Sequence, residues 1–348
     1  MIVRFCAYGF LKNLRLFEAF LVLALLERGL DFLAIGGLIA VREVAVNLLE
    51  VPSGAVADGV GRRRCLVLSM AAYLIAYIVL GLAESWAILA LGMVVYGVGD
   101  AFRSGTHKAL IYAWLRQQGR TAERTRIYGH TRSWSKLGSA VSALAGTAVL
   151  LTSDDYRWIF LASAGPAVLN LLNLVTYPAA LDETIPGARG GWRRSWTHLR
   201  VAAGACLRRG RLRRLVVASM GMEGGYAAAK DYLQPLLQTL AIATPIGLGL
   251  SGDERSAVIL GAVAALAFLL ASAAARQAHR CEAALGGADR AADRLILVQA
   301  GLFLAIGAAL LLDVPWIAVA AFVILGIAEN LWRPIHVRRF DRDGAEDH

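Results

Sequence analysis

Long, almost uncharged stretches recur along this 348-residue sequence, and they constrain its fold more than any other feature. Crossing the hydrocarbon core of a bilayer takes about 20 apolar residues in a helix. Backbone groups in lipid have no water to bond, so stretches of this kind must be helical. Ten stretches qualify: 13–26, 34–57, 65–83, 86–114, 135–152, 157–177, 214–242, 255–275, 295–312 and 315–332. The sequence therefore predicts an all-α, polytopic membrane protein.

Composition agrees with a chain that has lipid as the solvent for much of its surface. Hydrophobic residues make up 57% of the chain and charged residues only 18%, whereas soluble domains average about 25% charged residues. The net charge of +10 would suit nucleic-acid binding, but the basic residues lie in short patches between apolar stretches. We therefore predict no nucleic-acid partner. The four cysteines follow no pairing or metal-ligand spacing, so we also predict no metal site and no cofactor.

Positive charge alternates from one connecting loop to the next. Arginine-rich loops, such as 116–136 and 276–294, alternate with short loops that hold only Arg28, Arg157 or Arg255. Because basic loops stay on the cytoplasmic side, we predict an even number of spans with both termini cytoplasmic, in a bacterial-type cytoplasmic (inner) membrane. The domain organisation we expect is an N-terminal bundle (1–177), a basic cytoplasmic linker (178–213) and a C-terminal bundle (214–348).

The loop after the second stretch carries a distinctive pattern. It runs Gly54-Ala-Val-Ala-Asp58-Gly-Val-Gly61-Arg62-Arg63, which resembles the G-x-x-x-D-x-x-G-R-R/K signature between helices 2 and 3 of the major facilitator superfamily. The preceding run Glu50-Val-Pro-Ser-Gly54 and the stretch from Gly99 to Tyr112 are similar to segments of bacterial permeases in that superfamily. In the loop motif, Gly54 permits close helix approach and Gly61 a tight turn.

The resemblance implies a fold of two six-helix halves related by pseudo-symmetry. Twelve helices are expected for the family, and the sequence contains ten, so the chain resembles a permease that stops after its tenth helix with a four-helix C-terminal bundle. The implied function is secondary active transport of a small solute by alternating access, coupled to a proton or sodium gradient. A non-transporting membrane protein, either a sensor or an inactive truncated remnant, is the alternative. We expect a monomer.

Charged residues inside the apolar stretches are the candidate functional residues, because each such charge costs at least about 2.5–3.5 kcal/mol near the bilayer centre without a partner or a cavity. In the superfamily, helices 1, 4, 7 and 10 line the central cavity. The candidates for the substrate or proton pathway are Glu18, Glu43, Glu50, Asp100, Arg103, His107, Glu223, Lys230, Asp231 and Glu329. Structural ion pairing, for instance between Arg42 and a carboxylate, is the alternative for any one of them. Glu18 and Asp100 suit a proton carrier best.

Two further observations concern packing and chemistry. Gly138, Ser142 and Gly146 recur at every fourth position of the fifth stretch, which predicts close helix packing. No catalytic motif of the H-E-x-x-H or G-x-S-x-G type is present, and no phosphate-binding G-x-x-x-x-G-K-S/T motif occurs. We therefore predict that the chain is not an enzyme and that it does not use ATP as its energy source.

Overall fold

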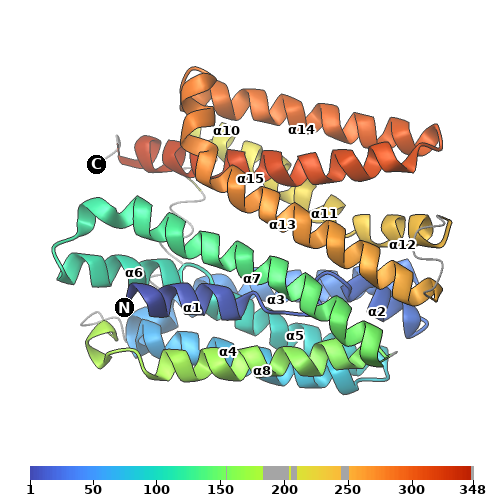
Figure 1. Ribbon diagram of the computed structural model, residues 1–348. Coiled ribbons are helices and arrows are strands. Elements are labelled where there is room, and N and C mark those ends of the chain that lie inside the picture. The colour runs from blue at the N-terminus through green and yellow to red at the C-terminus, as the bar shows by residue number, and fades with distance from the viewer. Residues whose placement is uncertain (154, 183–203, 205–209, 244–250, 346–348) are drawn as a thin grey trace. The chain divides into compact units, whose positions relative to one another are not determined.

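The structure, a computed structural model, describes residues 1–153, 155–182, 204, 210–243 and 251–345. All regular elements within these ranges are helices, which confirms the predicted all-α class. The chain divides into two compact units, Met1–Leu199 and Arg200–His348 (Figure 1). The division falls inside the predicted linker 178–213, most of which lies outside the described residues.

The described part of unit 1 contains five long α-helices and three short ones, besides two 3-10 turns over Thr121–Glu123 and Ala179–Leu181. The long helices are α3 (Phe32–Val60), α4 (Arg62–Leu82), α5 (Trp86–Arg103), α7 (Arg124–Ser153) and α8 (Arg157–Val175), and the short ones are α1 (Ile2–Lys12), α2 (Leu21–Glu27) and α6 (Thr106–Gln117). Side-chain caps mark the start of two long helices. Asp31 accepts a hydrogen bond from the backbone N–H of Ala34 at α3, and Ser85 accepts one from Ile88 at α5.

From residue 210 onward, the described part of unit 2 contains a segmented span followed by three long helices. The segmented span contains α10 (Gly210–Ser219), a π-helical turn over Met220–Gly224, α11 (Gly225–Lys230) and α12 (Leu233–Ala243). The long helices are α13 (Gly252–Ala284), α14 (Ala288–Leu311) and α15 (Pro315–Ala345). A capping box between Ser251 and Glu254 starts α13. Trp332 of α15 is fully buried in a core with Ala291, Ala292 and Leu295 of α14.

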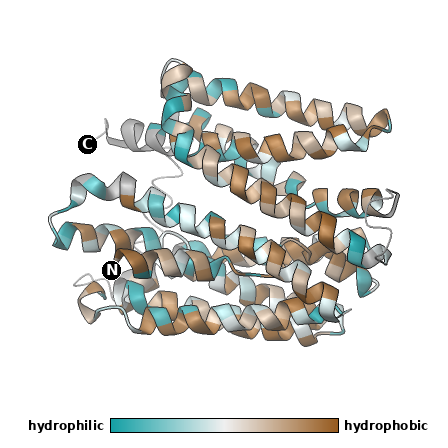
Figure 2. Cartoon of the chain, in the orientation of Figure 1, coloured by the Kyte–Doolittle hydropathy of each residue, from teal (hydrophilic) through white to brown (hydrophobic). Residues whose placement is uncertain are grey.

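Within the described ranges, eight segments are long and apolar enough to cross a membrane, by length and composition. These are Phe32–Glu50, Arg62–Leu82, Trp86–Gln117, Ile127–Ser153, Arg157–Val175, Glu254–Ala284, Ala288–Leu311 and Pro315–His336. Each corresponds to one predicted stretch. Large apolar side chains such as Leu33, Leu91, Leu172 and Leu297 are exposed on them, and Figure 2 shows hydrophobic residues along the long helices of both units. Exposed apolar surface of this extent marks contact with lipid.

The first and seventh predicted stretches are not continuous helices, so the prediction of one unbroken helix in each of them is wrong. The predicted span 13–26 begins in a non-helical segment, 13–20, which connects α1 to α2. The predicted span 214–242 is interrupted by the π-helical turn and by a turn between α11 and α12. The fourth stretch is also interrupted, between α5 and α6, where Gly105 has a φ of +69°. Hydropathy detects apolar length but not these interruptions, because they are stabilised by neighbouring helices.

Glycines of α7 allow the segment that contains the first break to approach closely. A Cβ atom at Gly138 would clash with the carbonyl oxygen of Phe10, and one at Gly146 would clash with the carbonyl oxygen of Leu16. Ser142, between them on the same helix face, is buried. The close packing predicted from the small residues of this helix is therefore confirmed, and its partner is the first span.

Candidate functional site

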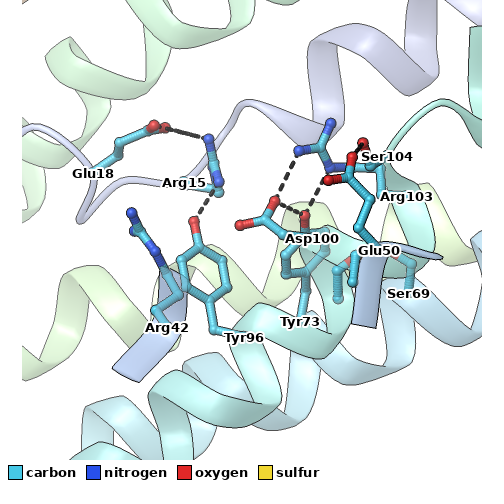
Figure 3. A network of polar contacts seen from close by, with 12 residues as sticks. Arg15, Glu18, Arg42, Glu50, Ser69, Tyr73, Tyr96, Asp100, Arg103 and Ser104 are labelled. Atoms are coloured by element: carbon cyan, nitrogen blue, oxygen red, sulfur yellow. Dashed lines mark hydrogen bonds and ion pairs between the residues drawn. The ribbon is translucent and has the colours of Figure 1, made fainter. Parts of the chain in front are cut away.

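The break between α1 and α2 is held by hydrogen bonds that replace helical ones. The side chain of Asn13 donates to the carbonyl of Gly9 at 2.7 Å, and the backbone N–H of Leu16 donates to the Ser163 hydroxyl of α8 at 2.9 Å. Backbone groups at this depth must be satisfied within the protein, and Ser163 supplies one of the missing partners. The break therefore directs the side chain of Arg15 toward Tyr96, with Glu18 beside it (Figure 3).

Arg15 joins the broken span to α5. Its guanidinium forms an ion pair with Glu18 at 2.8 Å and donates a hydrogen bond to the hydroxyl of Tyr96. The Arg42 guanidinium of α3 lies 5.5 Å from the centre of the same Tyr96 ring, and its ion pair is with Glu43 at 2.6 Å. Tyr96 thus contacts two arginines from two different elements, Arg15 through its hydroxyl and Arg42 through its ring.

A second set of polar contacts is centred on Asp100, one turn beyond Tyr96 on α5. Together with the contacts of Arg15 it forms the polar network of unit 1. Its carboxylate accepts hydrogen bonds from the Tyr73 hydroxyl of α4 at 2.5 Å and from Arg103 at 2.8 Å. Arg103 also donates from Nε to the Tyr73 hydroxyl at 2.8 Å, so the three groups form a closed triangle (Figure 3). The side chains of Asp100 and Arg103 are 18% and 28% exposed. A charge-assisted triangle of this kind fixes the orientation of the carboxylate.

Glu50 and His107 lie at the interruption of the fourth span. The Ser104 hydroxyl donates to Glu50 at 2.6 Å, and Ser53 of α3 donates to the carbonyl of Ala101 at 2.8 Å, so two bonds join α3 to the end of α5. His107 stacks on the Tyr8 ring with centroids 3.9 Å apart. Within the described residues, neither the Nε2 atom of His107 nor the Tyr8 hydroxyl has a hydrogen-bond partner, although both atoms are buried.

The remaining pathway candidates belong to unit 2. Lys230 and Asp231 pair with each other at 2.8 Å, and Glu223, in the π-helical turn, pairs with Arg333 of α15 at 3.5 Å. Glu329 is buried in α15. The side chain of Gln299 on α14 donates to the carbonyl of Met222 in the same turn at 3.1 Å and so joins α14 to the turn. The predicted candidates are thus divided between the two units.

The loop motif predicts a tight turn at Gly61 and a close helix approach at Gly54, and the structure agrees with the first of these expectations. Gly61 has a φ of +113°, a conformation that favours glycine, and this agrees with the expected tight turn. A Cβ atom at Gly54 would have no neighbour among the described residues, so the close approach expected at Gly54 is not seen. Arg62 is half-buried. The side chain of Asp58 lies outside the described residues.

Asp182, after the end of α8, is the partner of the loop arginines in unit 1. Its carboxylate accepts a hydrogen bond from the backbone N–H of Arg63 at 3.1 Å and lies 3.6 Å and 3.3 Å from the guanidiniums of Arg63 and Arg64. Arg63 also donates to the carbonyl of Tyr177 at 2.9 Å. Burial raises the pKa of the Tyr177 hydroxyl, which therefore stays protonated and donates to the carbonyl of Arg4.

Sequence reasoning missed several residues of the network. Four of them, Arg15, Tyr73, Tyr96 and Asp182, are absent from the predicted candidates. A hydroxyl in the middle of an apolar span is a usable signal, because a buried Tyr hydroxyl usually finds a hydrogen-bond partner. No comparable signal exists for Asp182, which is 119 positions away from Arg63. Among the described residues, no group of three His, Cys, Asp or Glu side chains could hold a metal ion.

Two crystal structures share this fold. They are of the nucleoside transporter NupG, one of a mutant and one of the unmodified protein, with TM-scores of 0.75 and 0.71 and 14% sequence identity. Each alignment covers 96% of this chain, and 81% or 80% of the NupG chain. At this identity the likeness shows the fold alone.

Sequence comparison identifies the family. A segment of 104 residues is 31% identical to YxaM of Bacillus subtilis (strain 168), an uncharacterized MFS-type transporter, and covers 29% of this chain and 26% of that relative. The pattern that defines the Major Facilitator Superfamily matches residues 1–335, nearly the whole chain, and confirms the resemblance seen in the loop motif. The protein is a multi-pass membrane protein, and it belongs to the Major Facilitator Superfamily.

Proposed function

We propose that this chain is a secondary active transporter that moves a small solute across a bacterial-type cytoplasmic membrane by alternating access. Its family and the transporters that share its fold support a membrane transporter. The main structural argument for the proposal is the set of charges at the break in the first span. The break places Arg15, which pairs with Glu18, against Tyr96 of α5. Tyr96 is four positions before Asp100, and both lie in a segment that is long enough to span the membrane.

The energetics favour a functional role for this network. Each charge near the bilayer centre costs at least about 2.5–3.5 kcal/mol unless it is paired or hydrated. A buried ion pair is a poor source of stability, because apolar residues of the same volume often stabilise the fold as well or better. Three arginine–carboxylate pairs meet around α5, formed by Arg15, Arg42 and Arg103. Their presence is best explained by a polar solute pathway.

The interrupted helices provide a second argument. Discontinuous helices in transporters place backbone groups and charged side chains at the midplane, where substrate and coupling ions bind. In this chain the first span is interrupted at 13–20 and the seventh at Met220–Gly224, which are the corresponding spans of the two halves. The two compact units provide the bundles whose relative motion alternating access requires.

We propose coupling to a proton or sodium gradient, with Glu18 as the first proton-carrier candidate. Asp100 accepts hydrogen bonds from both Tyr73 and Arg103, so protonation of Asp100 would disrupt contacts between α4 and α5. Glu18 pairs with Arg15, three positions away in the same broken segment, and it is 38% exposed. Its protonation would release Arg15 while the hydrogen bond from Arg15 to Tyr96 persists.

Reconstitution in proteoliposomes tests the proposal. The full chain is expected to exchange at least one labelled solute of a broad panel by counterflow, and the panel includes nucleosides because NupG shares the fold. An imposed inside-acid or inside-alkaline gradient should drive accumulation of that solute. Arg103→Gln should abolish the exchange, whereas Arg157→Gln, at a surface ion pair outside the network, should retain it. A well-folded wild-type protein that exchanges nothing would favour a non-transporting membrane protein.

A further inference from the structure

The two units repeat the same order of helices over most of their length. In each unit a broken span is followed by two long helices joined at a glycine of positive φ, Gly61 between α3 and α4 and Gly287 between α13 and α14. The next long helix packs back on this pair, α5 on α4 and α15 on α14. α14 is therefore the counterpart of α4. In unit 1, α8 also packs on α4, whereas no described helix of unit 2 covers α14 in this way.

Burial shows the difference between these two counterpart helices. In the apolar span of α4, 56% of the residues are buried, against 22% in that of α14. A Cβ atom at Gly81 of α4 would lie 2.9 Å from the Leu161 side chain of α8. Gly307 follows Ala288, the first residue of α14, by as many positions as Gly81 follows Arg62, the first residue of α4. A Cβ atom at Gly307 would meet no described atom within 4 Å. The glycine that lets α8 approach α4 thus recurs on an open face of α14.

A groove of about 620 Å³ lies on this side of α14. Ile296 lines it, at the position on α14 that Met70 has on α4, and Met70 contacts Asn170 of α8 at 3.3 Å. The groove therefore lies where a counterpart of α8 would pack. The other residues that line it are apolar or small, apart from four polar ones, and come from α10, the π-helical turn and α14: Arg213, Arg214, Val217, Ala218, Gly221, Met222, Asp293, Gln299, Ala300 and Phe303.

Gln299 points to the chemistry of the occupant of this groove. It is only 4% exposed, and its Oε1 atom has no hydrogen-bond partner among the described residues. A buried acceptor of this kind calls for a donor. In unit 1, α8 supplies polar groups to the first span, because Asn170 donates to the carbonyl of Tyr8 and Ser163 accepts from the N–H of Leu16. A helix with one polar side chain can therefore satisfy Gln299, whereas the acyl chain of a lipid has no donor.

Basic residues at the start of the broken span indicate the direction of the occupant. In unit 1, Arg4 of α1 donates to the carbonyl of Thr176, just after the end of α8, at 2.7 Å. Arg213 and Arg214 are exposed near the start of α10 and line the groove. Cations stabilise the C-terminal end of a helix, where the last carbonyls have no intrahelical partner. A helix that lies in the groove as α8 lies in unit 1 would therefore end beside these two arginines.

We propose that the groove on α14 is the docking site of a transmembrane helix from a separate polypeptide. This helix is antiparallel to α14, as α8 is to α4, carries a hydrogen-bond donor for Gln299 and ends beside Arg213 and Arg214. Pairing of α14 with α14 of a second copy does not meet these conditions, since two copies inserted alike in one membrane hold these helices parallel. The inference concerns assembly and is independent of the proposed transport.

Helix docking can be measured on the full chain in phosphatidylcholine nanodiscs. The probe is a synthetic peptide of residues 155–182, which contains α8, with the substitution Leu161→benzoylphenylalanine as a photoreactive group. Crosslinked residues are mapped by mass spectrometry, and we expect them on α14 around Gly307. Gly307→Leu, which fills the open position, should lower the crosslink yield at least about tenfold. Gln299→Leu should lower it about threefold, the effect of an average interhelical hydrogen bond in a membrane.

The matched control is Gly165→Leu on α8, another glycine whose Cβ would meet nothing within 4 Å, and it should leave the yield unchanged. A leucine–alanine helix of the same length should crosslink evenly over the exposed apolar faces. An equally even distribution for the α8 peptide, crosslinks on α4 around Gly81, no crosslinks at all, or an unchanged yield with Gly307→Leu would each overturn the inference. Loss of the crosslinks on addition of phosphatidylglycerol would assign the groove to anionic lipid and overturn it too. Counterflow is a separate assay, so none of these outcomes bears on transport.

Discussion

Arg15 donates a hydrogen bond to the hydroxyl of Tyr96, and this contact joins a segment that is not helical to the middle of a long helix. The contact exists only because the first span is interrupted after Lys12. In a continuous helix, the position of Arg15 in the helical repeat would by itself determine the direction of its side chain. The break thus places Arg15, a residue near the start of the chain, in the polar network of unit 1 (Figure 3).

The Arg15–Tyr96 hydrogen bond can be removed without removing the ring. Tyr96→Phe should lower the affinity for the transported solute by about tenfold, because a hydrogen bond to a charged group contributes about 1.5–3 kcal/mol and Arg15 keeps its pair with Glu18. Initial counterflow rates at several solute concentrations measure this effect. Tyr77→Phe, in the same aromatic cluster, is the control, since no described hydrogen bond joins its hydroxyl to the network. Equal effects of both substitutions would argue against a positioning role for Tyr96.

Asp100 and Arg103 should behave as a coupled pair. Asp100→Asn leaves Arg103 without its carboxylate and should destabilise the protein by about 2 kcal/mol, less than for a fully buried pair because both side chains are partly exposed. The double variant Asp100→Asn/Arg103→Gln should be destabilised by less than the sum of the two single changes. Thermal unfolding in detergent provides the four values. Strict additivity would show that the two groups do not interact energetically.

Protonation of Glu18 can be tested through proton movement. Glu18→Gln should still exchange solute by counterflow but should no longer acidify or alkalinise vesicles when solute is added, because the neutral amide cannot carry a proton. An entrapped pH-sensitive dye follows this signal. Glu84→Gln, at an exposed position between α4 and α5, is the control and should retain coupling. Normal pH changes with Glu18→Gln would exclude Glu18 as the carrier, and the same assay on Asp100→Asn tests the second candidate.

The glycines of α7 should be intolerant of even one methyl group. Gly138→Ala places a Cβ atom against the Phe10 carbonyl, a rigid backbone group, and should cost about 1–3 kcal/mol. Gly165→Ala on α8 is the matched control, since its Cβ would meet nothing within 4 Å, and alanine in a helix should stabilise by about 0.5–1 kcal/mol. The melting temperatures of the two variants measure both changes in stability. A Gly138→Ala protein as stable as the wild type would show that α1 and α7 are packed less closely.

Asp182 should hold the end of α8 to the turn before α4. Asp182→Asn removes the carboxylate that faces Arg63 and Arg64, and hydrogen exchange of residues 175–182 should become faster as a result. Asp155→Asn, at the surface pair with Arg157, should leave exchange in that segment unchanged. Unaltered protection of residues 175–182 in Asp182→Asn would mean that backbone contacts, such as those to Arg4 and Arg63, hold the segment without the charge.

The amino-acid sequence by itself determined the class of protein, the approximate position of most spans and the family. These properties depend on local quantities, namely apolar length and a short loop motif with Gly61 at its turn. Asp100 and Arg103 were also predictable, because a charge inside an apolar stretch is costly wherever it points. Gly138 and Gly146 indicated close packing through their spacing alone, although the sequence did not identify their partner.

Only the tertiary structure decided where the first span breaks and what the break brings together. Whether 13–20 is helical depends on partners that are distant in sequence: Ser163, which satisfies the N–H of Leu16, and Gly146, which lets its carbonyl approach α7. The same is true of Tyr96 with Arg15 and of Asp182 with Arg63. Hydropathy adds up the preferences of individual residues for lipid, whereas these contacts depend on the geometry of several helices at once.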